Sequence, residues 1–253
     1  MTDIVTPAST ILLLRDRPEE MEILMVERHR DMKFMGGALV FPGGKVDPTD
    51  EELAAALSTE FDDAALRIAG IREVFEECGI LLAREKNDHA MISDEHRHEV
   101  ALKYRKAIDK HEIPLSDMLE KEGLELALDA MVKFAHWITP KPSPRRYDTH
   151  FYLAVTPDDH TAAHDGAESV DSVWIRPSVA LEDEAAKRRE IVFPTRLNIE
   201  KLARSKTTEE ALAAARADTI VTVMPRIENG KLHIPKEAGY SLTEESVERA
   251  FHK

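Results

Sequence analysis

Residues 72–80 read REVFEECGI, and this stretch limits what the chain can fold into more than any other. It lies within residues 62–83, where the apolar periodicity predicts a helix with Asp62 or Asp63 as its N-cap and Gly79 as its C-terminal breaker. Residues three and four apart share one face of a helix, so Glu73, Glu76 and Glu77 would project together. The opposite face carries the side chains expected to be buried, which are Ile71, Val74, Phe75 and Cys78. Like charges at this spacing repel by roughly a few tenths of a kcal/mol per pair. A cation bound among the three carboxylates would offset this repulsion.

A glycine turn precedes this helix at the end of a predicted strand. Residues 38–41 form a short apolar run, and Pro42-Gly43-Gly44 follows it as a strong turn signal. Glycine has no Cβ, so its backbone can approach a ligand closely. A strand, a glycine turn and an acidic helix can therefore form one cleft, in which a hard divalent cation would bind carboxylates and an anionic substrate. The alternative interpretation is a solvated acidic helix face.

The overall charge limits the partners of the chain. Its 253 residues carry 48 acidic and 34 basic side chains, which gives a formal net charge of −14. Such a surface repels nucleic-acid backbones and anionic membranes, and no apolar run is long enough to span a bilayer. We therefore expect neither a nucleic-acid polymer nor a membrane as partner. Cys78 is the only cysteine and no signal peptide is recognisable, which favours a cytoplasmic location.

The remaining periodicity predicts a mixed arrangement of strands and helices. Strands are predicted at residues 9–16, 21–29, 38–41, 149–155 and 170–175. Helices are predicted at residues 47–60, 62–83 and 197–215, and two or three more within the charged residues 88–134. A hairpin is predicted to turn at Asn229-Gly230. Strands and helices do not alternate regularly, which favours an α+β fold around a mixed sheet.

REVFEECGI resembles, position for position, the second half of the Nudix box, R-E-U-x-E-E-x-G-U, in which U is an apolar residue. The matching positions are Arg72, Glu73, Val74, Glu76, Glu77, Gly79 and Ile80. FPGGKVD, residues 41–47, resembles the opening of the box, with Gly44 as its glycine. The box here is interrupted, because 21 residues separate Asp50 from Arg72 where the family pattern has seven. Asp50, Glu51 and Glu52 are the candidates for the first acidic position.

The interrupted box resembles one branch in particular, the Nudix proteins similar to peroxisomal acyl-CoA diphosphatases. The resemblance implies a Nudix α/β/α sandwich around a mixed sheet. We expect residues 5–196 to form this domain, with a helical insertion at about residues 88–135. Residues 197–253 would be an extension, a helix and a hairpin, packed on the domain.

The resemblance also implies roles for individual residues. Glu73, Glu76 and Glu77, together with the Gly44 carbonyl, would bind Mg²⁺ or Mn²⁺, and Arg72 would orient the glutamates. Glu168 is the candidate general base, with a solvated loop charge as the alternative. The candidates for binding substrate phosphates are Arg145, Arg146, Gly43 and Gly44.

The implied function is metal-dependent hydrolysis of a diphosphate linkage in a nucleotide-containing small molecule, with CoA or acyl-CoA as the first choice. NADH or ADP-ribose is the alternative substrate class within the same chemistry. A non-catalytic Nudix-fold binding module is a second possibility. A third is an interaction protein in which residues 88–134 form the working surface of a homodimer. Pairs of histidines at residues 96 and 98, and at 160 and 164, have a spacing that permits metal binding, but no further ligand pattern supports a zinc site there.

Overall fold

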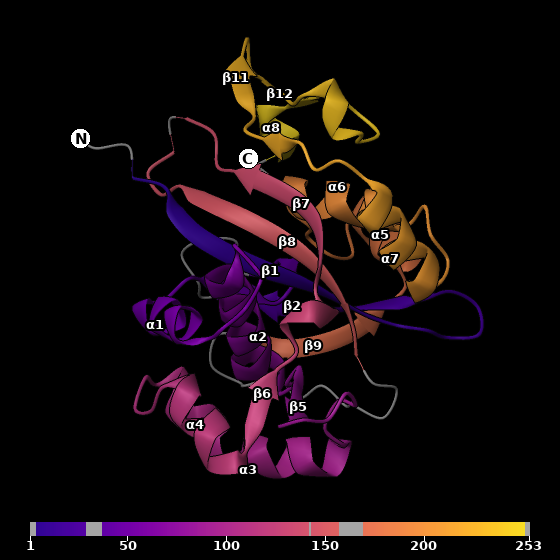
Figure 1. The fold of residues 1–253 in the computed structure, drawn as a ribbon. Coiled ribbons are helices and arrows are strands. Elements are labelled where there is room, and N and C mark those ends of the chain that lie inside the picture. Colours follow the sequence, from indigo (N-terminus) through magenta and orange to yellow (C-terminus); the bar gives the residue numbers. More distant parts are fainter. Residues whose placement is uncertain (1–3, 29–36, 142, 157–168, 251–253) are drawn as a thin grey trace.

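The structure is a computed structural model that describes residues 4–28, 37–141, 143–156 and 169–250 (Figure 1). Its main sheet has eight strands, in the order β10-β7-β8-β1-β2-β3, with β4 paired to β1 and β9 paired to β2. Their bounds are β1 (Thr6–Arg15), β2 (Glu22–Arg28), β3 (Leu39–Val40), β4 (Gly43–Lys45), β7 (Val132–Ile138), β8 (Tyr147–Val155), β9 (Ser169–Ile175) and β10 (Thr222–Val223). The sheet is mixed, because β1 pairs parallel with β8 and antiparallel with β2. The predicted α+β fold around a mixed sheet is confirmed.

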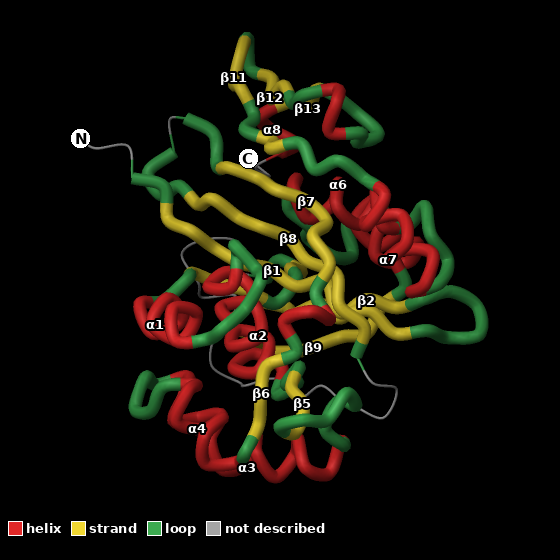
Figure 2. Tube along the Cα trace, in the orientation of Figure 1, coloured by secondary structure: helices red, strands yellow, loops and turns green. Residues whose placement is uncertain are grey.

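Helices cover both faces of the sheet (Figure 2). The side chains of β1 alternate between two apolar cores, since successive residues of a strand point to opposite faces. Ile11 and Leu13 belong to the core that contains the apolar face of α2 (Ala64–Cys78). Leu12 and Leu14 belong to the core covered by α5 (Pro177–Ala185), α6 (Phe193–Leu202) and α7 (Thr208–Ala217). This arrangement is the predicted three-layer sandwich.

The helix that carries the glutamates is shorter than the sequence predicts. It begins after the N-cap residue Asp63 and ends at Cys78, and Gly79 follows in the left-handed conformation with φ of 68°. Glycine adopts this conformation without the strain that a Cβ would cause. The predicted N-cap at Asp62 or Asp63 and the predicted breaker at Gly79 are confirmed. The predicted continuation to residue 83 is wrong, because Ile80, Leu81 and Leu82 leave the helix and are buried as chain leading into β5 (Ala83–Glu85).

Between β5 and β7 the chain forms two helices and a small strand pair below the sheet (Figure 1). The helices are α3 (Asp94–Asp109) and α4 (Leu115–Glu122), and β6 (Leu124–Leu126) pairs with β5. Two arginines of α3 reach the end of α2: Arg97 Nη1 donates to Gly79 O at 2.6 Å, and Arg105 Nε donates to Glu76 O at 2.8 Å. The last carbonyls of a helix lack partners within it, so these cations satisfy and stabilise the end of α2.

The C-terminal residues differ from the sequence prediction in one respect. The single helix predicted for residues 197–215 is wrong, because α6 and α7 are separate and α7 starts at its own N-cap, where Thr207 accepts from Glu210 N at 3.2 Å. The predicted hairpin is confirmed: β11 (Arg226–Glu228) and β12 (Lys231–His233) are joined by Asn229 and Gly230, both at positive φ. The chain continues into β13 (Glu244–Ser246) and α8 (Val247–Ala250).

Two earlier expectations are not decided by this architecture. The division into a domain of residues 5–196 and an extension of residues 197–253 stays a prediction, and so does the homodimer.

A short helix, α1 (Pro48–Ala56), precedes α2 and packs against it. None of the helices in the described part of the chain has the length and apolar character needed to cross a membrane.

The capping of α2 by α3 yields a first prediction. Replacing Arg97, which is 3% exposed, by methionine should lower the free energy of unfolding by about 2–3 kcal/mol, because the Gly79 carbonyl loses a charged donor. Lys103→Met on the same helix is the matched control, since its ion pair with Glu122 is solvent-exposed and worth about 0–1 kcal/mol. Urea denaturation of the metal-free proteins measures both. Equal losses in the two variants would show that α3 does not stabilise the end of α2.

Candidate active site

The glycines and the glutamates meet where β4 lies against α2. Gly43 and Gly44 are part of strand β4 rather than the predicted turn, and they pair antiparallel with Thr10 and Ser9 of β1. A Cβ on Gly44 would lie 2.3–2.6 Å from the atoms of the Glu73 carboxyl group, so a side chain at this position would displace that carboxyl group. The Gly43 N–H donates to Glu77 Oε2 at 3.2 Å. The structure thus brings together Gly43, Gly44 and two of the predicted glutamates.

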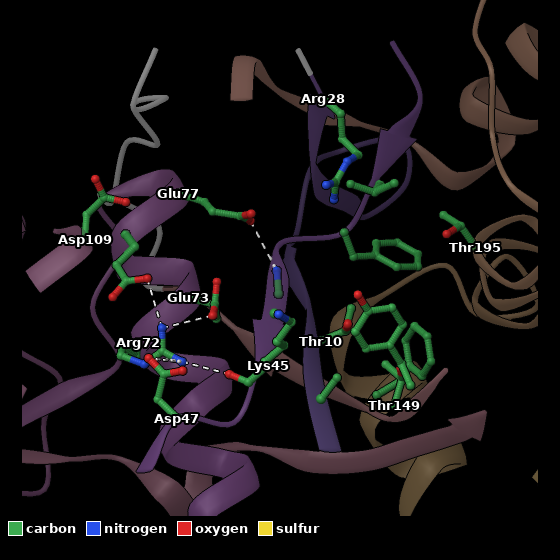
Figure 3. A pocket seen from close by; sticks show the side chains of 18 of the residues that line it. Thr10, Arg28, Lys45, Asp47, Arg72, Glu73, Glu77, Asp109, Thr149 and Thr195 are labelled. Carbon is green, nitrogen blue, oxygen red and sulfur yellow. Dashed lines mark hydrogen bonds and ion pairs between the residues drawn. The ribbon is translucent and has the colours of Figure 1, made fainter. Parts of the chain in front are cut away.

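A buried arginine organises the carboxylates (Figure 3). Arg72 is 3% exposed, and its Nη1 donates to Glu73 Oε1 at 2.9 Å and to Glu76 Oε2 at 3.0 Å. Its Nη2 donates to the Lys45 carbonyl at 2.9 Å and to Asp50 Oδ2 at 3.0 Å. Burial opposes the charge of Arg72, but the hydrogen bonds and fields of these carboxylates outweigh it and raise the pKa of Arg72. The guanidinium therefore fixes the orientation of two glutamates and joins α2 to β4.

Of the three candidates for the first acidic position, Asp50 is the one that contacts Arg72. It is 1% exposed, accepts from Arg72 Nε at 3.0 Å and from the Asp47 N–H at 2.9 Å. Glu51 and Glu52 are exposed. The extra residues between Asp50 and Arg72 form the rest of α1 and a loop, and because α1 packs against α2 the two residues still meet.

The environment of Glu76 disfavours its ionised form. Burial, with repulsion from Glu73 and Asp109, outweighs the attraction of Arg72 and raises the pKa of Glu76 to about 7. Burial likewise raises the pKa of Glu73, against the opposing effect of Arg72. The second oxygen of Glu76, Oε1, is buried and has no hydrogen-bond partner within the described residues. A cation placed here would satisfy that oxygen and reverse the penalty on both carboxylates.

The donor set fits a hard divalent cation. The carboxylates of Glu73, Glu76 and Glu77 and the backbone of Gly44 supply oxygen atoms, which Mg²⁺ and Mn²⁺ prefer over nitrogen or sulfur. The close approach of Gly44 to Glu73 and the unpartnered Oε1 of Glu76 are the observations that support this fit.

A cleft of about 510 Å³ opens beside the glutamates (Figure 3). On the wall facing them stand residues of β1 and β8, which are Ala8, Thr10, Tyr147, Thr149 and Phe151. Arg28, at the end of β2, lies across the cleft from Glu77, and its Nε is buried without a hydrogen-bond partner among the described residues. Asp109 and His111, from the end of α3 and the residues after it, also line the cleft.

Sequence reasoning missed Arg28, Asp109 and His111. Arg28 lies at the end of an ordinary strand and has no motif around it, so only the sheet topology places it opposite the glutamates. Asp109 and His111 lie in a charged segment whose residue pattern is typical of a solvated helix, so nothing in the sequence distinguishes them from their neighbours.

The two arginines proposed from sequence lie elsewhere. Arg145 is exposed, and Arg146 is buried with its Nε donating to the Thr139 carbonyl at 3.0 Å. Neither is among the described residues that line the cleft. Glu168 falls outside the described residues. The phosphate-binding role of the arginines and the general-base role of Glu168 stay predictions.

Comparison with known proteins identifies the family. A model of the NUDT19 Nudix domain matches residues 54–202. The chain belongs to the Nudix hydrolase family. This Nudix chain is 29% identical over 184 residues to putative nudix hydrolase 7 of Caenorhabditis elegans, across 73% of this chain and 56% of the relative. It is 25% identical over 213 residues to acyl-coenzyme A diphosphatase NUDT19 of Xenopus laevis, across 67% of this chain and 56% of the relative.

A solved structure supports the same fold. The crystal structure of a NUDIX hydrolase from Alicyclobacillus acidocaldarius superposes with a TM-score of 0.69 at 27% identity, covering 84% of this chain and 97% of that one. The Nudix sandwich predicted from the sequence is therefore confirmed. The chain spans little more than half the length of the two curated relatives, 56% of each.

The raised pKa of Glu76 predicts how the stability of the metal-free protein depends on pH. The folded chain keeps the Glu76 proton up to about pH 7, whereas an ordinary glutamate releases it near 4.5. Raising the pH through this window favours the unfolded state, which has already lost the proton. The free energy of unfolding of the wild-type chain should therefore fall, relative to Glu76→Gln, from about pH 4.5 to about pH 7.

Urea denaturation in the presence of a chelator, at several pH values across this window, measures the difference. Glu51→Gln, an exposed neighbour on α1, should track the wild-type chain at every pH. A constant difference between wild type and Glu76→Gln would mean that Glu76 ionises normally in the folded chain.

Proposed function

We propose that this chain hydrolyses a diphosphate linkage in a nucleotide-containing small molecule, with the help of a divalent cation, and that CoA or acyl-CoA is its substrate class. The observation that carries the proposal is the carboxylate cluster held by Arg72 on one wall of a cleft, with Arg28 on the other. Hydrolysing a diphosphate requires a cation for its oxygens and positive charge for the rest of the anion. The cleft offers a site for each.

In this proposal the side chains of Glu73, Glu76 and Glu77 and the Gly44 carbonyl hold Mg²⁺ or Mn²⁺. When bound, the ion supplies Lewis-acid stabilisation of the developing phosphate charge. Arg72 keeps Glu73 and Glu76 in orientation through the two hydrogen bonds of its Nη1. The Gly43 N–H restrains Glu77 from the β4 side. Arg28, whose Nε has no partner among the described residues, binds a phosphate oxygen of the substrate.

Two observations favour CoA or acyl-CoA. The family model that matches is that of the NUDT19 Nudix domain, and the Xenopus laevis relative is named an acyl-coenzyme A diphosphatase. The cleft is lined by Phe41, Tyr147 and Phe151 as well as by polar groups, which suits a substrate with an aromatic base and a phosphate chain.

The alternatives make different demands on the same cleft. NADH or ADP-ribose would use the same cation and the same Arg28, but would not bring the additional 3′-phosphate of CoA. A non-catalytic binding module would not need the complete carboxylate set that Arg72 holds together, so the structure favours an enzyme.

Hydrolysis of a panel of diphosphates tests the proposal. With Mg²⁺ and then Mn²⁺, we expect the release of 3′,5′-ADP from CoA and acetyl-CoA. Glu77→Gln should lower kcat by about 100-fold or more, because even the loss of a group behind a metal ligand costs about 10–100-fold. Glu52→Gln, which changes an exposed glutamate of α1, is the matched control and should retain wild-type rates.

The panel also contains NADH, ADP-ribose and nucleoside triphosphates. Turnover of NADH or ADP-ribose alone would keep the chemistry and reject the CoA assignment. Failure to hydrolyse any member with either cation would reject the enzyme and favour the binding module.

Arg28 and Arg145 give a direct comparison between structure and sequence. Arg28→Gln should lower kcat/KM by about 10–100-fold, the equivalent of one charged hydrogen bond of about 1.5–3 kcal/mol. Arg145→Gln, an exposed residue outside the lining of the cleft, should leave kcat/KM within about twofold of wild type. Steady-state kinetics on the substrate found in the panel decides the matter. The reverse pattern would return phosphate binding to Arg145, as the sequence predicts.

A further inference from the structure

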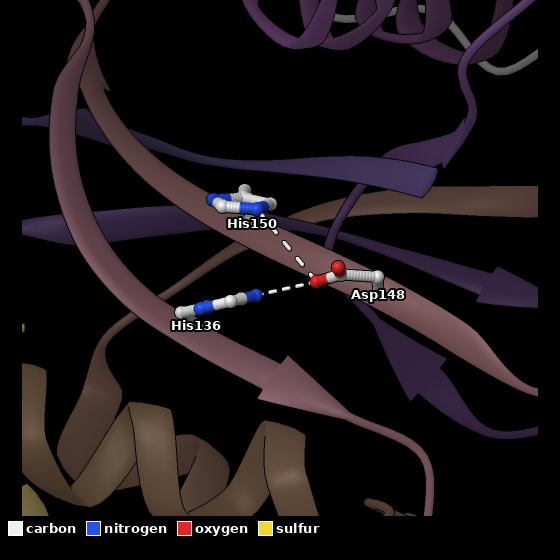
Figure 4. Close-up of side chains that lie close together, drawn as sticks. All are labelled: His136, Asp148 and His150. Atoms are coloured by element: carbon white, nitrogen blue, oxygen red, sulfur yellow. Dashed lines mark hydrogen bonds and ion pairs between the residues drawn. The ribbon is translucent and has the colours of Figure 1, made fainter. Parts of the chain in front are cut away.

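Three potential ligands for a metal gather on one face of the β7–β8 pair (Figure 4). His136 of β7 lies directly opposite His150 of β8 in the antiparallel register. Asp148 lies two residues before His150 on β8, and residues two apart in a strand point to the same side. The register of the sheet, rather than a local motif, therefore brings two imidazoles and a carboxylate together.

The donor atoms of the three side chains converge. His136 Nε2 and Asp148 Oδ1 are in direct contact, and His150 Nε2 lies 3.7 Å from the same oxygen. The two rings are stacked, with centroids 4.0 Å apart and an interplanar angle of 20°. The ligand atoms all lie within 4.8 Å of one another. A shared metal, whose bonds to nitrogen and oxygen measure about 2.0–2.2 Å, would require the stacked rings to rotate until both Nε2 lone pairs point at the ion.

The groups around the cluster prepare it for a cation. His136 Nδ1 lies 2.7 Å from Thr222 Oγ1 of β10, so with an ion bound the hydroxyl can accept the Nδ1 proton and leave the lone pair of Nε2 to bind the ion. A simple aspartate–histidine hydrogen bond would account for His136 and Asp148. That hydrogen bond does not explain why the His150 ring also points towards Asp148 Oδ1.

We propose that His136, Asp148 and His150 bind a divalent transition-metal ion of the Zn²⁺ class. Two imidazoles and one carboxylate suit Zn²⁺, whereas the all-oxygen set around Glu73 suits Mg²⁺ or Mn²⁺. The bound ion joins neighbouring strands β7 and β8, and Thr222 extends the connection to β10.

This site is separate from the proposed active site. Tyr147, Thr149 and Phe151 line the glutamate cleft, and they alternate along β8 with Asp148 and His150. Alternate residues of a strand point to opposite faces, so the histidine cluster lies on the face of β8 opposite to the residues that line the cleft. This face also carries Tyr152, which packs in the core beneath α2. The inference does not depend on which substrate the cleft accepts, or on catalysis at all.

Zinc binding to the full chain with Glu73, Glu76 and Glu77 changed to glutamine tests the proposal without competition from the cleft. We expect one equivalent of Zn²⁺ by calorimetry and elemental analysis, and a higher melting temperature of the protein with Zn²⁺ than without. His136→Gln and His150→Gln should each weaken Zn²⁺ binding by about 100-fold or more. His98→Gln, an exposed histidine on α3, is the matched control and should bind as before.

Spectroscopy of Co²⁺ bound to the wild-type chain gives a second readout that does not need the triple variant. Visible absorption typical of low-coordinate Co²⁺ with imidazole ligands should appear, disappear in Asp148→Asn and His150→Gln, and persist in Glu77→Gln. If the triple variant binds no Zn²⁺, or if the equivalent survives His136→Gln and His150→Gln with unchanged affinity, the proposal is wrong. The cluster would then be a hydrogen-bonded aspartate–histidine pair with a stacked neighbour.

Discussion

The site depends on the charge of one buried guanidinium. Arg72 contacts the carboxylates of Asp50, Glu73 and Glu76 and the carbonyl of Lys45, so it joins α1, α2 and β4 at one point. Without this cation, the buried carboxylates of Asp50 and Glu76 and the half-buried one of Glu73 would lie together with nothing to balance them. With it, the acidic charges still exceed the basic one. The cluster is therefore incomplete by itself and is suited to accept a further positive charge.

The sequence predicts the part of the site that lies within one helix, because the spacing of Glu73, Glu76 and Glu77 determines their face. It also predicts that glycines approach this face, which Gly44 does. Asp50 was one of three candidates, and its selection depends on how α1 folds back onto α2. Arg28 was not predicted, because its position opposite the glutamates follows from strand order alone. The cap residues of α2 were predicted, but its continuation to residue 83 was wrong, because buried chain such as Leu81 continues past Gly79 without being helical.

The histidine cluster shows the same limit more clearly. The histidine pairs noticed in the sequence, at residues 96 and 98 and at 160 and 164, are close along the chain. The fold instead brings together His136 of β7 and His150 of β8. Their contact depends on the register in which the two strands pair, and local spacing in the sequence does not reveal that register. The insertion helix α3 is a similar case. Its charge pattern is typical of a solvated helix, yet Arg97 and Arg105 complete the hydrogen bonding at the end of α2.

Strand β8 carries one set of residues for each face of the sheet, and its pairing with β1 extends in parallel over nine residue pairs, from Thr6 opposite Tyr147 to Leu14 opposite Val155. The pleat makes the two sets interchangeable by a shift of one residue. Such a shift would turn Asp148 and His150 towards the cleft and would turn Thr149 and Phe151 away from it. The long parallel ladder thus holds the residues that line the cleft and the histidine cluster on opposite faces of β8, so an insertion or deletion within the strand would exchange the two sets.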